Sequence, residues 1–441
     1  MTPIARIGIT ALLAAPLVTA QDAPTVARLL PAHMSVEVEA KKTKTLEIHF
    51  AQPMSQTGHS FCGGGPKFPK FKGRPRWKNR KTMIVEVELE PDHLYSMSLN
   101  CPAAKNFRSA AGVSLTPTPW SFTTLPAKLP NQKKQRKLNA RSFAALGNVL
   151  PAKYSYYEHK KLDWDRIFAK SKAEILAAKT TRGWTVAVGK MLKSANDLHM
   201  YLRVGGQTIG TGSRRIDSLY RGDLLKKYLP TLQQPMRGVL TGKTKDGIGY
   251  LMIGGWRKNI DFDAVEKLIV GMKDAKALII DVRPNSGGGE NLARQVAQWF
   301  VPGMKVYAKH ATRKGKGATN FYNVSRRRIV GKPKKERFGK PVAVLMSRYC
   351  MSSCEAFLLM MRQAEHCKLI GQRSYGSSGN PKGHELPNGV EIVLPSWKVM
   401  RLDGSCFEDE GLAPDIEVKA TAKDLEKRDP ILEKALAHLR N

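Results

Sequence analysis

The fold is decided by two stretches of sequence, KALIIDVRPNSGGGENLARQVAQWF (residues 276–300) and KPVAVLMSRYCMSSCEAFLLMMRQ (residues 340–363). Each begins with a short apolar run that predicts a buried strand, over residues 277–282 and 342–346. A tight polar turn follows, and then apolar residues recur at helical spacing. We therefore predict two strand–turn–helix units.

The two turns carry residues suited to chemistry. A helix that begins directly after a strand exposes its first backbone N–H groups, which form a ready anion site. One turn offers Gly287 and Gly288, which lack a Cβ and allow close approach of a substrate. The other offers Ser352 and Ser353 at the start of its helix. This pairing suits acyl transfer, with a nucleophile on one turn and oxyanion donors from both.

These segments resemble the tail-specific (C-terminal-processing) serine protease family. LIIDVRPNSGGG resembles its strand-and-turn segment, and MSSCEAF resembles its nucleophile segment, Ser-x-x-Glu before an apolar helix. DLHMY, GQRSYGSSG and DGSCFEDEGLAPDIEV are similar to three more segments, and all five occur in the family's order between residues 197 and 418. The resemblance implies a crotonase/ClpP-like core of repeated ββα units, in agreement with the two units predicted above.

The resemblance implies that Ser352, three residues before Glu355, is the nucleophile. A serine at a helix start is otherwise often only an N-cap. The backbone N–H groups of Ser353 and of Gly287 or Gly288 would then form the oxyanion hole. A catalytic Cys354 is the alternative, but the family places serine at the attacking position.

The choice of base departs from much of the family. Many members use a lysine where this chain has Ser377, and Lys382 lies five residues further on as an alternative. The tricorn-core-like branch uses a histidine instead, and His199 of DLHMY matches that histidine. The ordinary histidine pKa near 6.5 suits a general base at neutral pH.

The same branch supports its histidine with further side chains. Glu408 matches the supporting glutamate, and Glu410 competes for that place in the alignment. A serine precedes the histidine in that branch, whereas this chain has Leu198, so one link is missing or supplied by another residue. The resemblance implies no metal and no organic cofactor.

The order of segments predicts a multidomain α/β (α+β) fold. Residues 21–126 contain short alternating strands, which predict a β-sandwich and resemble bacterial Ig-like domains of the surface-layer type. Residues 127–138 are rich in proline and lysine and predict a linker. We expect a helical segment at 139–200, the protease domain at 201–430 and a C-terminal helix at 431–441.

The start of the chain predicts export. Residues 1–20 contain Arg6, an apolar run and a small-residue V-T-A cleavage site, which together indicate a signal peptide and not a membrane span. We therefore expect a periplasmic or extracellular protein in which cysteines can pair. Cys62 and Cys101 both lie in the N-terminal region and are candidate disulfide partners. No cysteine spacing indicates a zinc site.

The formal net charge of +36 is unusual for an enzyme. The basic clusters are either a solvated surface or a binding surface for an anionic cell-envelope partner. They are scattered and match no nucleic-acid-binding module.

The sequence therefore predicts an exported serine endopeptidase acting on polypeptides. The alternative from another class is a catalytically weak peptide- or envelope-binding protein that keeps the protease fold, which Leu198 and Ser377 favour. A third reading makes the N-terminal module an envelope anchor.

Overall fold

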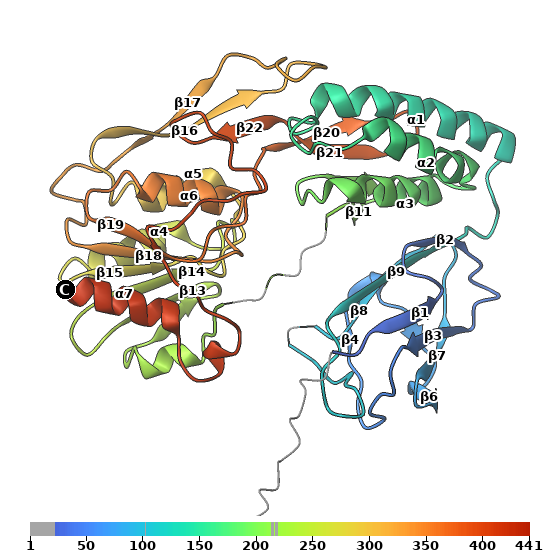
Figure 1. The fold of residues 1–441 in the computed structure, drawn as a ribbon, viewed down its shortest axis with the longest axis horizontal. Helices are drawn as coiled ribbons and strands as arrows, with labels where there is room; N and C mark the ends of the chain where they lie inside the picture. Colours follow the sequence, from blue (N-terminus) through green and yellow to red (C-terminus); the bar gives the residue numbers. More distant parts are fainter. Residues whose placement is uncertain (1–22, 102, 213–215, 217–218) are drawn as a thin grey trace, which may run out of the picture. The chain divides into compact units, whose positions relative to one another are not determined.

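The computed structural model describes residues 23–101, 103–212, 216 and 219–441. The predicted signal peptide at 1–20 lies outside these residues. The chain divides into two compact units, Met1–Pro130 and Asn131–Asn441, and each is described by itself (Figure 1).

The N-terminal unit contains two β-sheets. Its strands are β1 (Val26–Leu30), β2 (Ser35–Val38), β3 (Thr45–Phe50), β4 (Phe61–Cys62), β5 (Lys70–Phe71), β6 (Arg76–Asn79), β7 (Thr82–Glu88), β8 (Leu94–Leu99) and β9 (Thr118–Thr124). One sheet has the order β1-β3-β7-β5, with β6 also paired to β7, and the other has the order β2-β9-β8-β4.

The two sheets share one hydrophobic core. Alternate residues of β3 are buried, as expected for a strand with one face on a core. The core includes Ile48 of β3 and Val85 of β7 from one sheet, and Met97 of β8 and Trp120 of β9 from the other. The prediction of a strand-rich N-terminal region is confirmed, whereas the Ig-like assignment stays a prediction. A disulfide joins Cys62 to Cys101 in this unit.

The C-terminal unit is built around a seven-stranded sheet with the order β12-β13-β14-β15-β18-β19-β23. Its strands are β12 (Gln233–Met236), β13 (Val239–Lys243), β14 (Gly249–Ile253), β15 (Leu278–Asp281), β18 (Val342–Met346), β19 (Cys367–Gly371) and β23 (Ile416–Glu417). The strands from β14 to β23 run parallel, whereas β12 and β13 are antiparallel to their neighbours. The two predicted strand–turn–helix units are β15–α5 and β18–α6.

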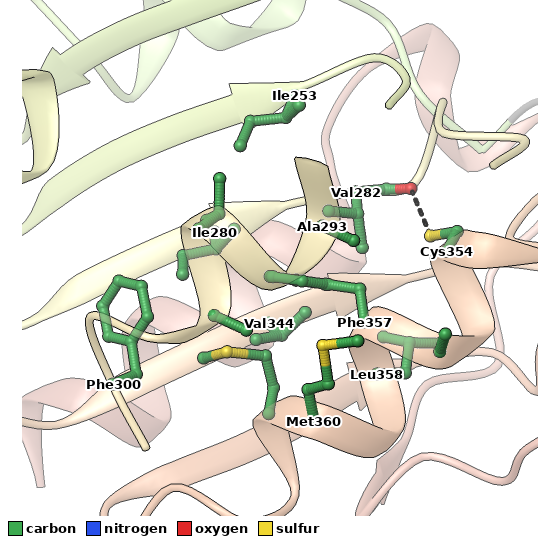
Figure 2. Packing of buried hydrophobic residues seen from close by; sticks show 14 of the residues in the cluster. Ile253, Ile280, Val282, Ala293, Phe300, Val344, Cys354, Phe357, Leu358 and Met360 are labelled. Atoms are coloured by element: carbon green, nitrogen blue, oxygen red, sulfur yellow. Dashed lines mark hydrogen bonds between the residues drawn. The ribbon is translucent and has the colours of Figure 1, made fainter. Parts of the chain in front are cut away.

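Helices cover both faces of this sheet (Figure 1). They are α4 (Phe262–Gly271), α5 (Glu290–Ala297) and α6 (Ser353–Met361) on one face and α7 (Pro430–Arg440) on the other. Successive residues of β15 alternate between the two cores, since Ile280 packs with α4 to α6 and Ile279 packs with α7. Figure 2 shows Phe357 and Leu358 of α6 pointing into the first core beside Val344 of β18. Helix α6, which follows Ser352, is therefore packed against the central sheet.

Two smaller sheets and three helices complete this unit. The sheets are β17-β16-β22, with β16 (Met304–Thr312), β17 (Ser325–Val330) and β22 (Trp397–Met400), and β11-β10-β21-β20, with β10 (Tyr201–Val204), β11 (Gln207–Gly210), β20 (Pro381–Glu385) and β21 (Glu391–Pro395). The helices are α1 (Gln132–Lys153), α2 (Trp164–Ala177) and α3 (Thr181–Leu192). None of the helices in the described ranges combines the length and hydropathy needed to cross a bilayer.

The structure corrects the predicted linker at 127–138, because α1 already begins at Gln132. The side chain of Asn131 accepts hydrogen bonds from the N–H groups of Lys133 and Lys134, which is an N-cap. Lysine is also a good helix former, so a lysine-rich run after a cap residue continues as a helix. The composition of this segment suggested a linker, but its local capping chemistry specifies a helix.

Candidate active site

Ser352 ends the turn between β18 and α6, which begins at Ser353. Its backbone has a φ of 56°, a left-handed conformation that serine rarely adopts. Its N–H donates to the carbonyl of Ser377 at 2.8 Å and to Glu355 Oε2 at 3.1 Å. Strained backbone of this kind is concentrated at functional sites, and here two acceptors hold it in place.

His199 lies in the turn before β10. Its Nε2 is 3.1 Å from Ser352 Oγ, and its Nδ1 is 2.9 Å from Ser377 Oγ. Its backbone N–H donates to Asp197 Oδ1 at 2.8 Å, and the Tyr154 hydroxyl donates to the other oxygen of that buried carboxylate at 2.8 Å. The imidazole therefore lies between two serine hydroxyls, on a backbone that Asp197 holds.

Glu408 is buried beside the 377–378 turn. Its Oε2 accepts the N–H of Ser378 at 2.9 Å, and its Oε1 is 3.9 Å from Lys160 Nζ. Burial holds the pKa of this carboxyl well above its ordinary value. The hydroxyl next to His199 Nδ1 belongs to Ser377, so Glu408 contacts the turn that carries this hydroxyl.

The competing residues lie at the surface. Glu410 is exposed and pairs with Arg373 and Arg401, each at 3.1 Å. Lys382 is exposed on β20, where its backbone is opposite Leu394 of β21. Among the glutamates considered, Glu408 is therefore the one buried beside the 377–378 turn.

The glycine turn touches the nucleophile turn directly. An added Cβ at Gly287 would lie 2.8 Å from Ser352 Cβ, and an added Cβ at Gly288 would lie 1.9 Å from the carbonyl oxygen of Trp256. Both glycines have positive φ, 101° and 137°. No residue with a Cβ fits this approach without displacing the backbone.

The two turns also carry backbone donors. The N–H of Gly287 already donates to Asn285 Oδ1 at 2.8 Å. The N–H groups of Gly288 and Ser353 donate to no acceptor within the part of the chain that the structure describes. The Ser353 hydroxyl donates to the Gly288 carbonyl at 2.7 Å and so ties the two turns together. Of the two predicted glycines, the geometry favours Gly288 as an oxyanion donor beside Ser353.

The buried carboxylate of Glu355 connects the turn at Ser352 with the turn at 374–377. Its Oε1 accepts the Ser374 hydroxyl at 2.6 Å and the Gly376 N–H at 2.7 Å. Its Oε2 accepts the N–H groups of Ser377 and Ser352, both at 3.1 Å. Burial raises the pKa of this carboxyl to about 7, against the opposing effect of these four donors.

Cys354, the alternative nucleophile, is buried below the turn. Its Sγ lies 4.0 Å from the carbonyl oxygen of Val282, the contact drawn in Figure 2. Burial also holds the pKa of its thiol well above the ordinary value. Since the thiolate is the reactive form, this cysteine is unsuited to attack a substrate.

Three supporting residues had no assigned role in the sequence analysis. Asp197 stands two residues before His199 in the DLHMY segment, and Glu355 is the glutamate of the Ser-x-x-Glu pattern. Their positions in these motifs do not reveal which groups they contact. Ser377 occupies the position of the lysine found in many family members, and its contact with His199 depends on the fold.

Part of the chain matches a known family of sequences. Residues 247–418 match the sequence pattern described as "Peptidase family S41". The chain is 22% identical over 272 residues to "Carboxy-terminal processing protease CtpB" from Bacillus subtilis (strain 168), a match that covers 60% of this chain and 55% of that protein. The chain thus spans about half the length of this curated relative.

Solved structures match over a larger share of the chain. A crystal structure of a candidate peptidase from Parabacteroides merdae ATCC 43184 is 25% identical, with a TM-score of 0.60, and the match covers 68% of this chain and 96% of that one. The structure of mature CPAF complexed with lactacystin is 12% identical, with a TM-score of 0.52, and the match covers 69% of this chain and 99% of that one. The second likeness concerns the fold alone.

Proposed function

Residues 247–418 belong to peptidase family S41, and we propose that the chain is a serine endopeptidase that hydrolyses polypeptides through an acyl-enzyme at Ser352. The observation that carries this proposal is the 3.1 Å contact between Ser352 Oγ and His199 Nε2. The Ser352 turn and the glycine turn that touches it carry the backbone N–H groups of Ser353 and Gly288, which have no acceptor in the described chain. This arrangement supports Ser352 as the nucleophile, His199 as its base and the two N–H groups as oxyanion donors.

In the first half of the reaction, Ser352 Oγ attacks the carbonyl carbon of the scissile peptide bond. His199 Nε2 takes the hydroxyl proton, and the N–H groups of Gly288 and Ser353 stabilise the oxyanion. The imidazolium then gives this proton to the leaving amine as the C–N bond breaks. Water attacks the resulting ester by the same steps, which releases the carboxylic acid and restores the serine.

The support of His199 differs from the sequence expectation. A base with Nε2 unprotonated carries its proton on Nδ1, and this N–H donates to Ser377 Oγ at 2.9 Å. We infer that Ser377 supplies the hydroxyl that Leu198 cannot provide. Glu408 supports this turn through the Ser378 N–H. This arrangement removes one of the two features that favoured a catalytically weak binding protein.

The proposal includes export, for which the support is the signal-peptide pattern at residues 1–20. The substrate is then a polypeptide outside the cytoplasm.

A fluorophosphonate probe tests the enzyme directly. We expect the probe to label the wild-type protein on Ser352, as located by peptide mass mapping, and to leave Ser352→Ala unlabelled. Hydrolysis of a denatured protein substrate should fall by about 10⁶-fold in this variant. Ser353→Ala is the matched control, since it keeps the backbone donor and should still be labelled. Folded wild-type protein that takes up no probe would instead support the binding-protein alternative.

A further inference from the structure

Part of the surface around the candidate site exposes charges of one sign. Three segments meet here: the glycine turn at 283–289, the strand end at 254–259 that pairs with it, and the nucleophile turn at 347–352. Their exposed charged side chains are Arg257, Lys258 and Arg348. None of the three forms an ion pair or side-chain hydrogen bond with any described residue.

These cations lie close to the reacting groups. Trp256, the neighbour of Arg257, donates its N–H to the Gly287 carbonyl at 3.0 Å and accepts the Gly289 N–H at 2.7 Å. Arg348 is four residues before Ser352, so their Cα atoms are at most about 14 Å apart. The Debye length is about 8 Å at physiological salt and about 30 Å at 0.01 M, so the attraction that these charges exert on a bound substrate is strongest at low ionic strength.

Three nearby glutamates are engaged by other groups. Glu355 is buried among four donors, and Glu408 is buried beside Lys160. Glu290, at the start of α5, pairs with Arg327 and Arg294. On these three segments the exposed unpaired charge is therefore positive. Two carboxylates at the start of α4, Asp261 and Asp263, are exposed and form no ion pair with a described residue; they accept hydrogen bonds from N–H groups instead. The net charge of +36 on the whole chain acts in the same direction as the three cations.

We propose that this site selects acidic polypeptides, with Arg257, Lys258 and Arg348 attracting Asp and Glu residues that flank the scissile bond. The inference rests on the proposed peptidase function. Cations around a cleft raise the local concentration and the association rate of an anionic substrate, and salt weakens the effect. We therefore expect the preference for acidic substrates to be measurable in kcat/KM and to decrease as ionic strength rises.

The test uses internally quenched peptides built on a site that the enzyme cleaves in a denatured protein. Three versions differ only in carrying Glu, Gln or Lys pairs on both sides of that site. We expect kcat/KM for the Glu peptide to exceed that for the Gln peptide by about tenfold at low salt, with the Lys peptide slowest. Raising the salt to about 0.5 M should remove most of this difference.

Paired variants locate the effect. Arg257→Glu combined with Lys258→Glu should abolish or reverse the preference for the Glu peptide. The matched control is Lys334→Glu with Lys335→Glu, which changes the net charge equally beyond the C-terminal end of α5, the end opposite the glycine turn. There Lys332 N–H donates to the Gln298 carbonyl at 2.8 Å. This control should keep the preference.

The outcomes separate this inference from the function on which it rests. Equal hydrolysis of the three peptides by wild-type enzyme would overturn the inference and leave the peptidase proposal intact. An equal loss of preference in both double variants would assign selection to the overall charge and overturn the role of these three residues. Absence of both hydrolysis and fluorophosphonate labelling would instead reject the peptidase proposal.

Discussion

His199 Nδ1 lies 2.9 Å from the hydroxyl of Ser377, although 178 residues separate the two in sequence. A neutral hydroxyl thus lies where a serine protease triad places a carboxylate. The hydroxyl can orient the imidazole through one hydrogen bond, but it adds no negative charge to stabilise the imidazolium. Ser377 is therefore expected to act as a positioning residue.

Ser377→Ala should lower kcat/KM by roughly 3- to 10-fold, because one neutral hydrogen bond contributes about 0.5–1.5 kcal/mol. The bond fixes the tautomer of His199, so the pH profile of kcat/KM should also change in the variant. Ser377→Thr keeps the hydroxyl and should recover most of the activity. Ser378→Ala is the matched control one residue away and should behave like wild type. Equal losses in the two alanine variants would indicate a general effect on the turn.

A second prediction concerns the two glycines at 288 and 289. Gly288→Ala should abolish activity and destabilise the fold, because the new Cβ would lie 1.9 Å from the Trp256 carbonyl oxygen. Gly289→Ala should be tolerated, since Gly289 has a φ of −79° and its Cβ would meet Leu292 at 3.4 Å. Hydrolysis rates and thermal unfolding of both variants test this contrast. An active Gly288→Ala enzyme would contradict the assignment of this turn to the oxyanion hole.

Much of the core was predictable because its signals are local. The apolar runs at 277–282 and 342–346, each followed by a polar turn and a helical pattern, predicted β15–α5 and β18–α6. The candidate nucleophile and base were found through short motifs around Ser352 and His199. In the structure the turns at Gly288 and Ser352 lie together, because β15 and β18 are parallel neighbours whose carboxyl ends meet at one edge of the sheet. His199 precedes β10 of another sheet and reaches Ser352 through a contact between distant segments.

The remaining features depend on contacts between distant segments. The N–H of Gly287 donates to the side chain of Asn285, and this contact decides which of the two glycines can offer its N–H to a substrate. The role of Ser377 depends on how its turn lies against His199. The start of α1 was missed because the Asn131 cap lies inside a stretch whose composition is typical of linkers.

The pKa of Glu355 leads to a third prediction, on the pH dependence of activity. Each of the two carboxylate oxygens of Glu355 accepts two hydrogen bonds, so protonation of the carboxylate must displace one of four donors. Two of these donors are the backbone N–H groups of Ser352 and Ser377. Burial raises its pKa to about 7. Below that pH, protonation of Glu355 should add to protonation of the His199 base. We expect log kcat/KM to fall towards acid with a slope that exceeds 1.

Protonation of Glu355 is expected to lower activity but to raise the stability of the fold. The folded state holds the Glu355 proton up to about pH 7, whereas the unfolded chain releases it near the ordinary value of 4.5. The free energy of unfolding should therefore fall by about 3 kcal/mol through this group as pH rises from 4.5 to 7, and stay constant above. Denaturant titrations of wild type and Glu355→Gln across this range measure the difference. An acid limb of slope 1 in wild type, together with parallel stability curves, would rule out this titration.

The last prediction concerns the disulfide between Cys62 and Cys101, which closes a loop of 39 residues in the N-terminal unit. In the chain-entropy model such a cross-link restricts the unfolded chain and stabilises the fold by about 4 kcal/mol. Reduction, or the double variant Cys62→Ala with Cys101→Ala, should therefore lower the thermal stability of this unit. The melting temperature of the C-terminal unit, measured through the loss of peptide hydrolysis on heating, should change much less.

Cys367→Ala is the control for this experiment, since Cys367 is a free cysteine of the C-terminal unit. It removes a thiol without opening the loop, so reductant should still lower the melting temperature of the N-terminal unit in this variant. Intact-mass analysis under non-reducing conditions reports directly whether the two cysteines are joined, because alkylation then adds no mass at either position. Free thiols at both Cys62 and Cys101 in material taken from outside the cytoplasm would contradict the cross-link. A melting temperature that reductant leaves unchanged, in protein whose disulfide is intact beforehand, would show that the cross-link contributes little to the stability of the sandwich.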